Sequence, residues 1–444
     1  MARPDRRQFL QWSGAATTVL VAGCSGGPND GQQEETGTDT ENSADGPTAS
    51  PGGTRAEPAE TDTESSGKST TNAPWPQFAY DAANTGDATD RQGPDGDLSV
   101  AWEHEVDRFT YAPVVAGDAV VAQLPDGLRA FDAADGTELW SFTPGENGGS
   151  PPALAEGTAF VASNAGTLYA VDVADGTERW SADVGGRGLL AAPVVAGGSV
   201  IVAPREAPVT AFDPDGDRRW TAKVAGAGFP PASDGERIHC PVVDGEERGL
   251  AALSLADGDV DWQSSIDVRQ LGPVAVSSDR IVMSAAGSAV GDISGTSRST
   301  GYVGVDAGSG DPQWAVPKGY DLPLAPPLLG GDSAVIPGGD VDEEGDAHAY
   351  VVALEDGSAR DRHRFDPAPE ESGFMYHGAT AGDGVTYFSA SDTDRTGALT
   401  AVDGESGTAL GHVSLDVAVA SPPVIFDGRV YVAGEGGLVA IETV

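Results

Sequence analysis

Cationic side chains are scarce in this sequence. Lys and Arg together number 25 against 69 Asp and Glu, which gives a formal net charge of −44 at pH 7. A chain this acidic would be repelled by a polyanion, so nucleic-acid binding is not expected. Only 2 Cys are present, which excludes a disulfide framework. Gly (61) and Pro (31) are abundant instead, and this density argues against long helices and favours short strands joined by tight turns.

Residues 1–24 resemble an export signal. Arg6 and Arg7 stand in Arg-Arg-Gln-Phe-Leu, a short apolar run follows, and the run ends in Val21-Ala22-Gly23-Cys24. This arrangement resembles a twin-arginine signal joined to a lipoprotein box. The resemblance implies export by the twin-arginine route, cleavage before Cys24 and a lipid on its thiol, which places the protein on the outer face of the cell membrane. Two alternatives are a short buried helix with a chance Cys and an uncleaved transmembrane anchor, for which the apolar run is barely long enough.

Residues 25–72 differ in character from the signal. They are rich in Gly, Ser, Thr and Pro and hold ten acidic side chains against two basic ones. Such a segment cannot bury enough apolar surface to offset the entropy of ordering it. We therefore expect a disordered, extended, acidic tether between the membrane and a folded domain.

Most of the acidity falls in the remainder of the chain. Residues 1–24 carry +2 and residues 25–72 carry −8, so residues 73–444 carry −38. The acids are spread over the turns rather than clustered. Adaptation to concentrated salt would explain this halophilic composition, because the Debye length is only about 3 Å at 1 M. The alternative is an acidic surface that binds cations or a basic partner.

A repeat of about 40 to 50 residues organises this part of the chain. Its clearest copies, Leu128–Trp140 and Leu168–Trp180, share Ala-x-Asp-x-x-x-Gly-x-x-x-Trp. Further copies centre on Asp213, Ser254, Asp306, Glu355 and Asp403, and the last two lack the Trp. A second element, in which a Pro precedes two apolar runs separated by a Gly/Asp turn, begins at Pro113, Pro152, Pro193, Pro231, Pro273, Pro327, Gly378 (in place of Pro) and Pro423.

Each unit predicts four short strands, named A to D in chain order, with tight turns between A and B and between C and D. Eight such four-stranded antiparallel meanders are typical of an eight-bladed β-propeller, an all-β fold. The chain ends with Leu438–Glu442, a C strand without its D strand, whereas Leu98–Trp102 is a D strand without a blade. We expect these two segments to pair, which leaves no open blade edge.

The repeated motif is similar to the tryptophan-docking motif of quinoprotein-like eight-bladed propellers. Trp75–Gly86 is also typical of pyrroloquinoline quinone (PQQ)-like repeat proteins, and the resemblance covers residues 74–444. It implies that each indole packs between blades and donates its N–H to a backbone carbonyl. This structural role is expected for Trp102, Trp140, Trp180, Trp220, Trp262 and Trp314.

Other properties of that superfamily do not match. Quinoprotein alcohol dehydrogenases carry a disulfide between adjacent cysteines beside the cofactor and bind calcium through Glu, Asn and Asp. Here Cys240 is followed by Pro241 and no calcium set stands out, so neither a cofactor nor a metal is predicted. Cys240 is most simply a small core residue, with a nucleophilic role as its alternative. Asp340–Asp346 resembles the first half of a calcium loop, but Val351 stands where a bidentate Glu belongs, so a solvated acidic loop is predicted.

The long connections all fall on one side of the predicted ring. Three lie between B and C strands and one between a D strand and the next A strand: Ala285–Thr300, Gly338–His348, Ala390–Gly397 and Asp366–Gly378. Insertions on one face of a repeat protein usually mark its binding face. The sequence therefore predicts a partner-binding rim over the fifth to seventh units, unless the loops are merely tolerated surface. The rim would use Tyr320, Glu370, Glu371, Phe374, Tyr376 and His377.

These observations predict a monomeric, lipid-anchored, extracytoplasmic propeller that binds a protein or polysaccharide partner and catalyses no reaction. Several members of the resembled superfamily keep the blades and bind no quinone, and one of them, a lipoprotein, docks partner proteins. No hydrolase or kinase signature is present, and the six His have no metal-ligand spacing. The alternatives are a PQQ- or metal-dependent dehydrogenase and, more weakly, a hydrolytic propeller that uses carboxylates near the channel.

Overall fold

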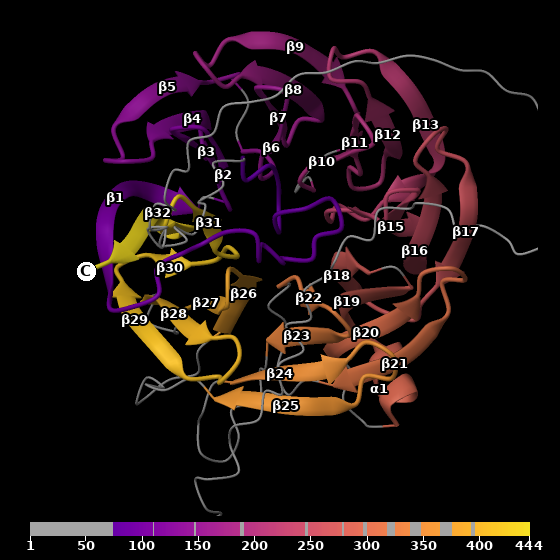
Figure 1. The fold of residues 1–444 in the computed structure, drawn as a ribbon. Coiled ribbons are helices and arrows are strands. Elements are labelled where there is room, and N and C mark those ends of the chain that lie inside the picture. The colour runs from indigo at the N-terminus through magenta and orange to yellow at the C-terminus, as the bar shows by residue number, and fades with distance from the viewer. Residues whose placement is uncertain are drawn as a thin grey trace, which may run out of the picture. The chain divides into compact units, whose positions relative to one another are not determined.

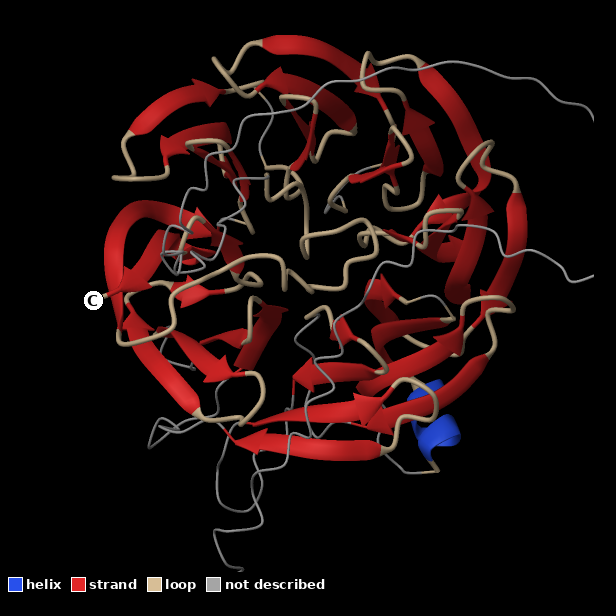
Figure 2. Cartoon of the chain, in the orientation of Figure 1, coloured by secondary structure: helices blue, strands red, loops and turns tan. Residues whose placement is uncertain are grey.

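The computed structural model describes residues 74–109, 111–145, 148–186, 191–244, 247–277, 279–295, 300–317, 325–337, 348–364, 375–391 and 396–444. Strands dominate this part of the chain, which has one short helix, α1 (Ser288–Ser294). Its strands form six four-stranded sheets and one eight-stranded sheet, and the large sheet contains two four-stranded units. Figures 1 and 2 show the eight units as blades around a common centre. The predicted eight-bladed, all-β fold is confirmed.

Blades 1 to 7 each contain four strands in chain order, from the innermost A to the outermost D (Figure 1). Blade 1 holds β2 (Val114–Ala116), β3 (Ala119–Leu124), β4 (Gly127–Asp132) and β5 (Glu138–Phe142). Blade 2 holds β6 (Ala153–Ala155), β7 (Thr158–Ala162), β8 (Thr167–Asp172) and β9 (Glu178–Asp183). Blade 3 holds β10 (Val194–Ala196), β11 (Ser199–Val202), β12 (Pro208–Phe212) and β13 (Arg218–Gly226). Blade 4 holds β14 (Ala232–Ser233), β15 (Arg237–Asp244), β16 (Glu247–Ser254) and β17 (Val260–Ser265).

Blades 5 and 7 have A strands of seven residues each, whereas the A strand of blade 6 has three. Blade 5 holds β18 (Gln270–Val276), β19 (Arg280–Ala286), β20 (Thr300–Asp306) and β21 (Pro312–Pro317). Blade 6 holds β22 (Leu328–Gly330), β23 (Ser333–Pro337), β24 (His348–Ala353) and β25 (Ala359–Arg364). Blade 7 holds β26 (Met375–Ala381), β27 (Val385–Ser391), β28 (Gly397–Asp403) and β29 (Ala409–Leu415). Blade 8 combines β30 (Ala418–Val419), β31 (Val424–Phe426) and β32 (Arg429–Thr443) with β1 (Leu98–Phe109).

The burial of each strand follows its place in the blade. Every residue of the B strand β3 is buried, because neighbouring blades cover both of its faces. The D strand β9 is exposed or half-buried throughout, and exposed and half-buried residues alternate from Arg179 to Asp183. Inner strands are therefore continuous apolar runs, and outer strands are rich in polar residues. This pattern indicates how far each strand lies from the centre of the ring.

Blade 8 is assembled from both ends of the described chain. β32 pairs with β31 through its first residues, as Val424 opposite Tyr431 shows. Its later residues pair antiparallel with β1, with Leu98 opposite Thr443 and Trp102 opposite Ala440. The expected pairing of Leu98–Trp102 with Leu438–Glu442 is therefore present.

Tryptophans join neighbouring blades as the motif predicts. Each indole N–H donates to the carbonyl of the residue that follows the Asp place of the next blade, at 2.8–3.1 Å. A buried indole is stabilising only when its N–H has such an acceptor. The donor and acceptor pairs are Trp102 and Ala133, Trp140 and Val173, Trp180 and Pro214, Trp220 and Leu255, Trp262 and Ala307, and Trp314 and Leu354.

The sixth copy of the motif needs one correction. The sequence suggested Glu355 for the Asp place, but Ala353 occupies it. Ala353 lies opposite Ser333 as Asp132 lies opposite Ala119 in blade 1. The amide of Gly357 also donates to the Ala353 carbonyl at 2.9 Å, the bond that Gly136 makes to Asp132 at 2.8 Å.

The motif glycines are required for indole docking. They have φ between +69° and +97°, which L side chains rarely adopt. A Cβ on any of them would also lie 2.5–2.8 Å from a ring carbon of the preceding blade's Trp. The six glycines are Gly136, Gly176, Gly216, Gly258, Gly310 and Gly357.

Residues 75–91, which we call the strap, connect the innermost strands of seven blades. The A strands have no strand partner on their inner side, and the strap supplies an acceptor to an A-strand amide in each of blades 1 to 7. Figure 1 shows this indigo segment crossing the centre of the ring. The amides and their acceptors are Val115 with Trp75, Leu154 with Pro76, Val195 with the Gln77 side chain, Ser233 with Ala82, Val276 with Ala83, Leu329 with Thr85 and Ala381 with Gly86.

Candidate functional site

The long connections lie where the sequence predicted them. They separate β19 from β20, β23 from β24 and β27 from β28, all B–C connections, and β25 from β26, a D–A connection. We call the side with B–C and D–A connections the loop face, and the side with A–B and C–D connections the turn face. Four of the predicted rim residues, Tyr320, Glu370, Glu371 and Phe374, lie outside the described residues.

Tyr376 does not belong to a partner-facing surface. It is only 4% exposed and its ring meets that of Phe388 edge-on, with centroids 6.3 Å apart. Burial raises the pKa of its phenol well above the usual value. The sequence missed this because β26 begins at Met375, ahead of the Gly378 that marks the usual A-strand start, so Tyr376 is already part of the sheet.

His377 lies at a β-bulge beside the loop face. The pairing of β26 with β27 shifts register between Tyr376 and Gly378, which leaves His377 as the extra residue. Its Nε2 lies 2.6 Å from the hydroxyl oxygen of Ser391, which is opposite Met375 at the same end of the strand pair. Burial lowers the pKa of the imidazole to about 4, so it is neutral near pH 7. The bond joins the two strand ends that border the 365–374 and 392–395 connections.

Blade 7 departs from the repeat pattern at His377 and Gly378. The residue before the A-strand Pro is apolar in every other blade, and the Pro itself is replaced only in blade 7. Gly378 is needed because a Cβ there would lie 2.9 Å from Pro422 of blade 8. The residues that correspond to His377 are Ala112, Pro151, Ala192, Pro230, Gly272, Pro326 and Pro422.

Buried hydroxyls, rather than an indole, join blade 7 to blade 8. Thr380 donates to the Pro423 carbonyl at 2.7 Å and Ser389 donates to the Ser421 carbonyl at 2.7 Å. Both side chains are fully buried. Thr380 and Ser389 were not singled out from the sequence.

The turn face is strongly anionic. Hydrogen bonds to the ionised form hold the pKa of several turn carboxyls below the usual value: from the Arg179 side chain to Asp172, from the Ser309 amide to Asp306 and from the Ser406 side chain to Asp403. These groups therefore stay charged well into the acidic range.

The described residues offer no ligand set for a quinone–calcium centre. Among them, no three His, Cys, Asp or Glu side chains gather closely enough to hold a metal ion. Cys240 is a single, fully buried thiol whose pKa is raised by burial, which fits a core residue and not a nucleophile. His239, fully buried beside it in β15, bonds Asp234 at 2.9 Å within blade 4.

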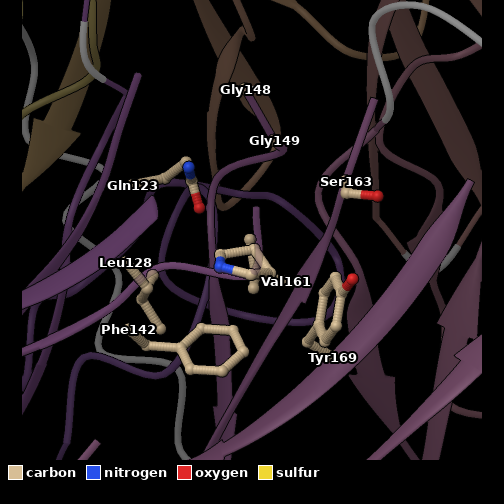
Figure 3. A pocket seen from close by; sticks show the side chains of 9 residues that line it. Gln123, Leu128, Phe142, Gly148, Gly149, Val161, Ser163 and Tyr169 are labelled. Atoms are coloured by element: carbon tan, nitrogen blue, oxygen red, sulfur yellow. The ribbon is translucent and has the colours of Figure 1, made fainter. Parts of the chain in front are cut away.

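A small pocket lies between blades 1 and 2 (Figure 3). Its volume is about 10 Å³, room for about one water molecule. Gln123, Leu128, Phe142, Val161, Ser163 and Tyr169 line it with mostly apolar surface. It is too small for an organic substrate.

Comparison with known proteins places the chain in a family. The family model described as outer membrane protein assembly factor BamB matches residues 125–359, more than half of the sequence. The chain belongs to this family. The matched residues run from the turn before β4 in blade 1 to the start of β25 in blade 6, so the divergent blade 7 lies outside them. No curated protein matches the chain in sequence.

Solved structures share the fold of this BamB-family chain. BamB from Moraxella catarrhalis aligns with a TM-score of 0.53 at 16% identity, over 78% of this chain and 97% of that one. Quinohemoprotein alcohol dehydrogenase from Comamonas testosteroni aligns at 0.61 and 16%, over 83% and 80%. A europium-containing methanol dehydrogenase aligns at 0.61 and 15%, over 83% and 91%. At these identities the likeness concerns the fold alone.

The export signal and the tether lie outside the described residues, and with them Arg6, Arg7 and Cys24. Within the described part, no helix combines the length and apolar character needed to cross a membrane.

Proposed function

We propose that this protein is a lipid-anchored, extracytoplasmic scaffold that binds a protein partner, or a polysaccharide, through its loop face and catalyses no reaction. The observation that carries the proposal is the asymmetry of the two faces. The strap bonds the inner strands close to the A–B turns, whereas the connections of ten residues or more, 338–347 and 365–374 among them, all join strand ends on the opposite side. Membership of a family described for an outer membrane protein assembly factor supports a partner protein.

The partner test uses full-length protein in intact membranes, with chemical crosslinking followed by co-purification. Phe374→Ala combined with Glu370→Gln should reduce recovery of the crosslinked partner at least about fivefold while the melting temperature stays unchanged. Leu139→Ala, on the exposed D strand of blade 1, is the matched control because Leu139 is 50% exposed and remote in sequence from the long connections. Equal recovery from all three proteins would contradict the assignment of the loop face.

The anchor has its own test. Cys24→Ala should move the protein from the membrane fraction to the medium, and Arg6→Lys with Arg7→Lys should retain the precursor inside the cell. A membrane-bound Cys24→Ala variant would contradict the lipid anchor and favour an uncleaved span.

A quinoprotein dehydrogenase is the second candidate, because two such enzymes share the fold at TM-scores of 0.61. The described residues do not supply its metal ligands or its paired cysteines. Purified protein is incubated with PQQ and calcium, and bound-quinone absorbance and dye reduction by alcohols or sugars are measured. Binding with turnover would reject the scaffold.

A further inference from the structure

Three exposed cations lie on the outermost strand of blade 3, β13, and we call Arg218, Arg219 and Lys223 the cationic stripe. Figure 1 shows β13 at the outer edge of the ring. From Arg219 to Val224 exposed and buried residues alternate, so Arg219, Thr221 and Lys223 share the exposed side of the strand. Among the D strands whose side chains are all described, only β13 has three exposed cations and no exposed carboxylate.

The cationic stripe has no carboxylate partner within the described residues. Arg218 donates to the Asp183 backbone carbonyl at 3.3 Å, Arg219 donates to the Ser199 hydroxyl at 2.8 Å, and Lys223 makes no hydrogen bond there. Other arginines of the described chain each have an Asp or Glu oxygen at 3.7 Å or less: Arg129, Arg179, Arg205, Arg237, Arg280, Arg360 and Arg429. Three neighbouring cations without such a partner leave their charge to an anion outside the described chain.

The spacing of the stripe indicates the shape of the anion. The Cα atoms of Arg219 and Lys223 are about 13 Å apart along the strand, because a strand rises about 3.3 Å per residue. Carboxylates four residues apart in an extended polypeptide have the same spacing. A guanidinium binds a carboxylate through two parallel N–H bonds, and the Thr221 hydroxyl adds a donor between the two cations. β13 bonds β15 only through its last two residues, so no strand of the described chain covers the edge beside the stripe.

We propose that the cationic stripe of blade 3 binds an extended acidic segment of a partner polypeptide. The charge of the folded part supports this choice. Residues 73–444 carry −38, so an acidic segment is repelled by the molecule as a whole and attracted where the cations lie together. The stripe lies on blade 3, whereas the predicted rim lies over the fifth to seventh blades, so this interaction does not depend on the loop-face function proposed above.

The probe is a fluorescein-labelled peptide of five Glu-Thr repeats, and the same peptide with Gln in place of Glu is its control. With full-length protein in about 50 mM KCl, fluorescence anisotropy should show binding of the Glu peptide alone, and about 1 M KCl should weaken that binding at least about fivefold. Arg219→Gln with Lys223→Gln should also weaken it at least about fivefold. Arg129→Gln with Arg269→Gln removes the same charge from blades 1 and 5 and should change binding less than about twofold.

A second measurement applies to the wild-type protein, whether or not the double variants fold. Carbodiimide coupling joins a carboxylate to an adjacent amine, and the lysines of the chain are Lys68, Lys223 and Lys318. The Glu peptide should couple to Lys223, and Lys223→Arg, which keeps the charge, should bind the peptide without coupling there.

Several outcomes would overturn the proposal. They are coupling at Lys68 or Lys318 in place of Lys223, equal binding of the Glu and Gln peptides, no binding by the wild-type protein, and equal binding by the stripe variant and its control. Phosphatidylglycerol vesicles that bind through the stripe when the peptide does not would overturn it as well, because the occupant would then be a lipid surface.

Discussion

The imidazole Nε2 of His377 lies 2.6 Å from the Ser391 hydroxyl oxygen, and this bond holds together the two strands that lead into the blade 7 connections. Burial lowers the pKa of His377 from 6.5 to about 4. The folded state therefore prefers the neutral ring. Its contribution to stability is complete above pH 6.5 and is lost as the pH falls toward 4.

The first prediction follows from the downward shift in the pKa of His377. Between pH 7.5 and pH 4.5 the free energy of unfolding should fall, and His377 should account for at most about 3 kcal/mol of the loss. His377→Gln should remove that part of the pH dependence in urea unfolding. The lowered pKa of His239 leaves a smaller slope of the same sign in the variant. Identical slopes in the two proteins would contradict the argument.

The second prediction separates backbone strain from indole docking. Gly176→Ala adds a methyl group 2.6 Å from a ring carbon of Trp140 at φ +73°. Gly384→Ala has the same φ of +73° but nothing within 4 Å. The control should lose about 1 kcal/mol and Gly176→Ala at least about 2 kcal/mol more, in chemical denaturation. Equal losses would show that the indole contact contributes nothing.

The third prediction concerns the strap. Asn84 is fully buried, has φ +55°, and donates to the carbonyls of Pro231 and Val274 at 2.8 and 2.9 Å. Asn84→Gly keeps the backbone conformation but loses both bonds, so it should cost about 2 to 4 kcal/mol in denaturant unfolding. Thr89→Gly, at an exposed strap position, should cost under about 1 kcal/mol. If both cost the same, the strap does not hold the inner strands.

Much of the fold was readable from the sequence because each blade repeats the same local rules. The Pro-led hairpins, the Gly turns and the Trp spacing predicted eight blades, and the unpaired Leu98–Trp102 predicted the partner of β32. The role of the strap was not predictable, because its acceptors are mostly backbone carbonyls that carry no side-chain signature. Cross-blade pairing was also missed: β13 extends to pair with β15, with Ala225 opposite Val243.

The candidate site was predicted less well than the fold. Loop position follows from strand order, so the side on which the long connections leave the strands was predicted correctly. Partner binding on that side stays a prediction. The rim position of Tyr376 was predicted wrongly because β26 extends beyond Gly378 through a bulge and already includes Tyr376. The Asp place of blade 6 was misassigned because Glu355 is the nearby acidic residue, whereas the strand register puts Ala353 there.

The last prediction concerns salt. Residues 73–444 carry −38, and the turn carboxyls keep low pKa values, so repulsion between them persists at neutral pH. We expect the melting temperature to rise as KCl increases from 0.2 M to 3 M, because the Debye length shortens to under about 3 Å. The matched variant combines Asp135→Asn, Asp257→Asn and Asp356→Asn. Each Asn keeps the side-chain oxygen that accepts the turn amide but removes one exposed charge. This variant should reach a given melting temperature at lower KCl. Equal salt responses in the two proteins, or a response reproduced by sucrose, would show that charge repulsion is not what the salt relieves.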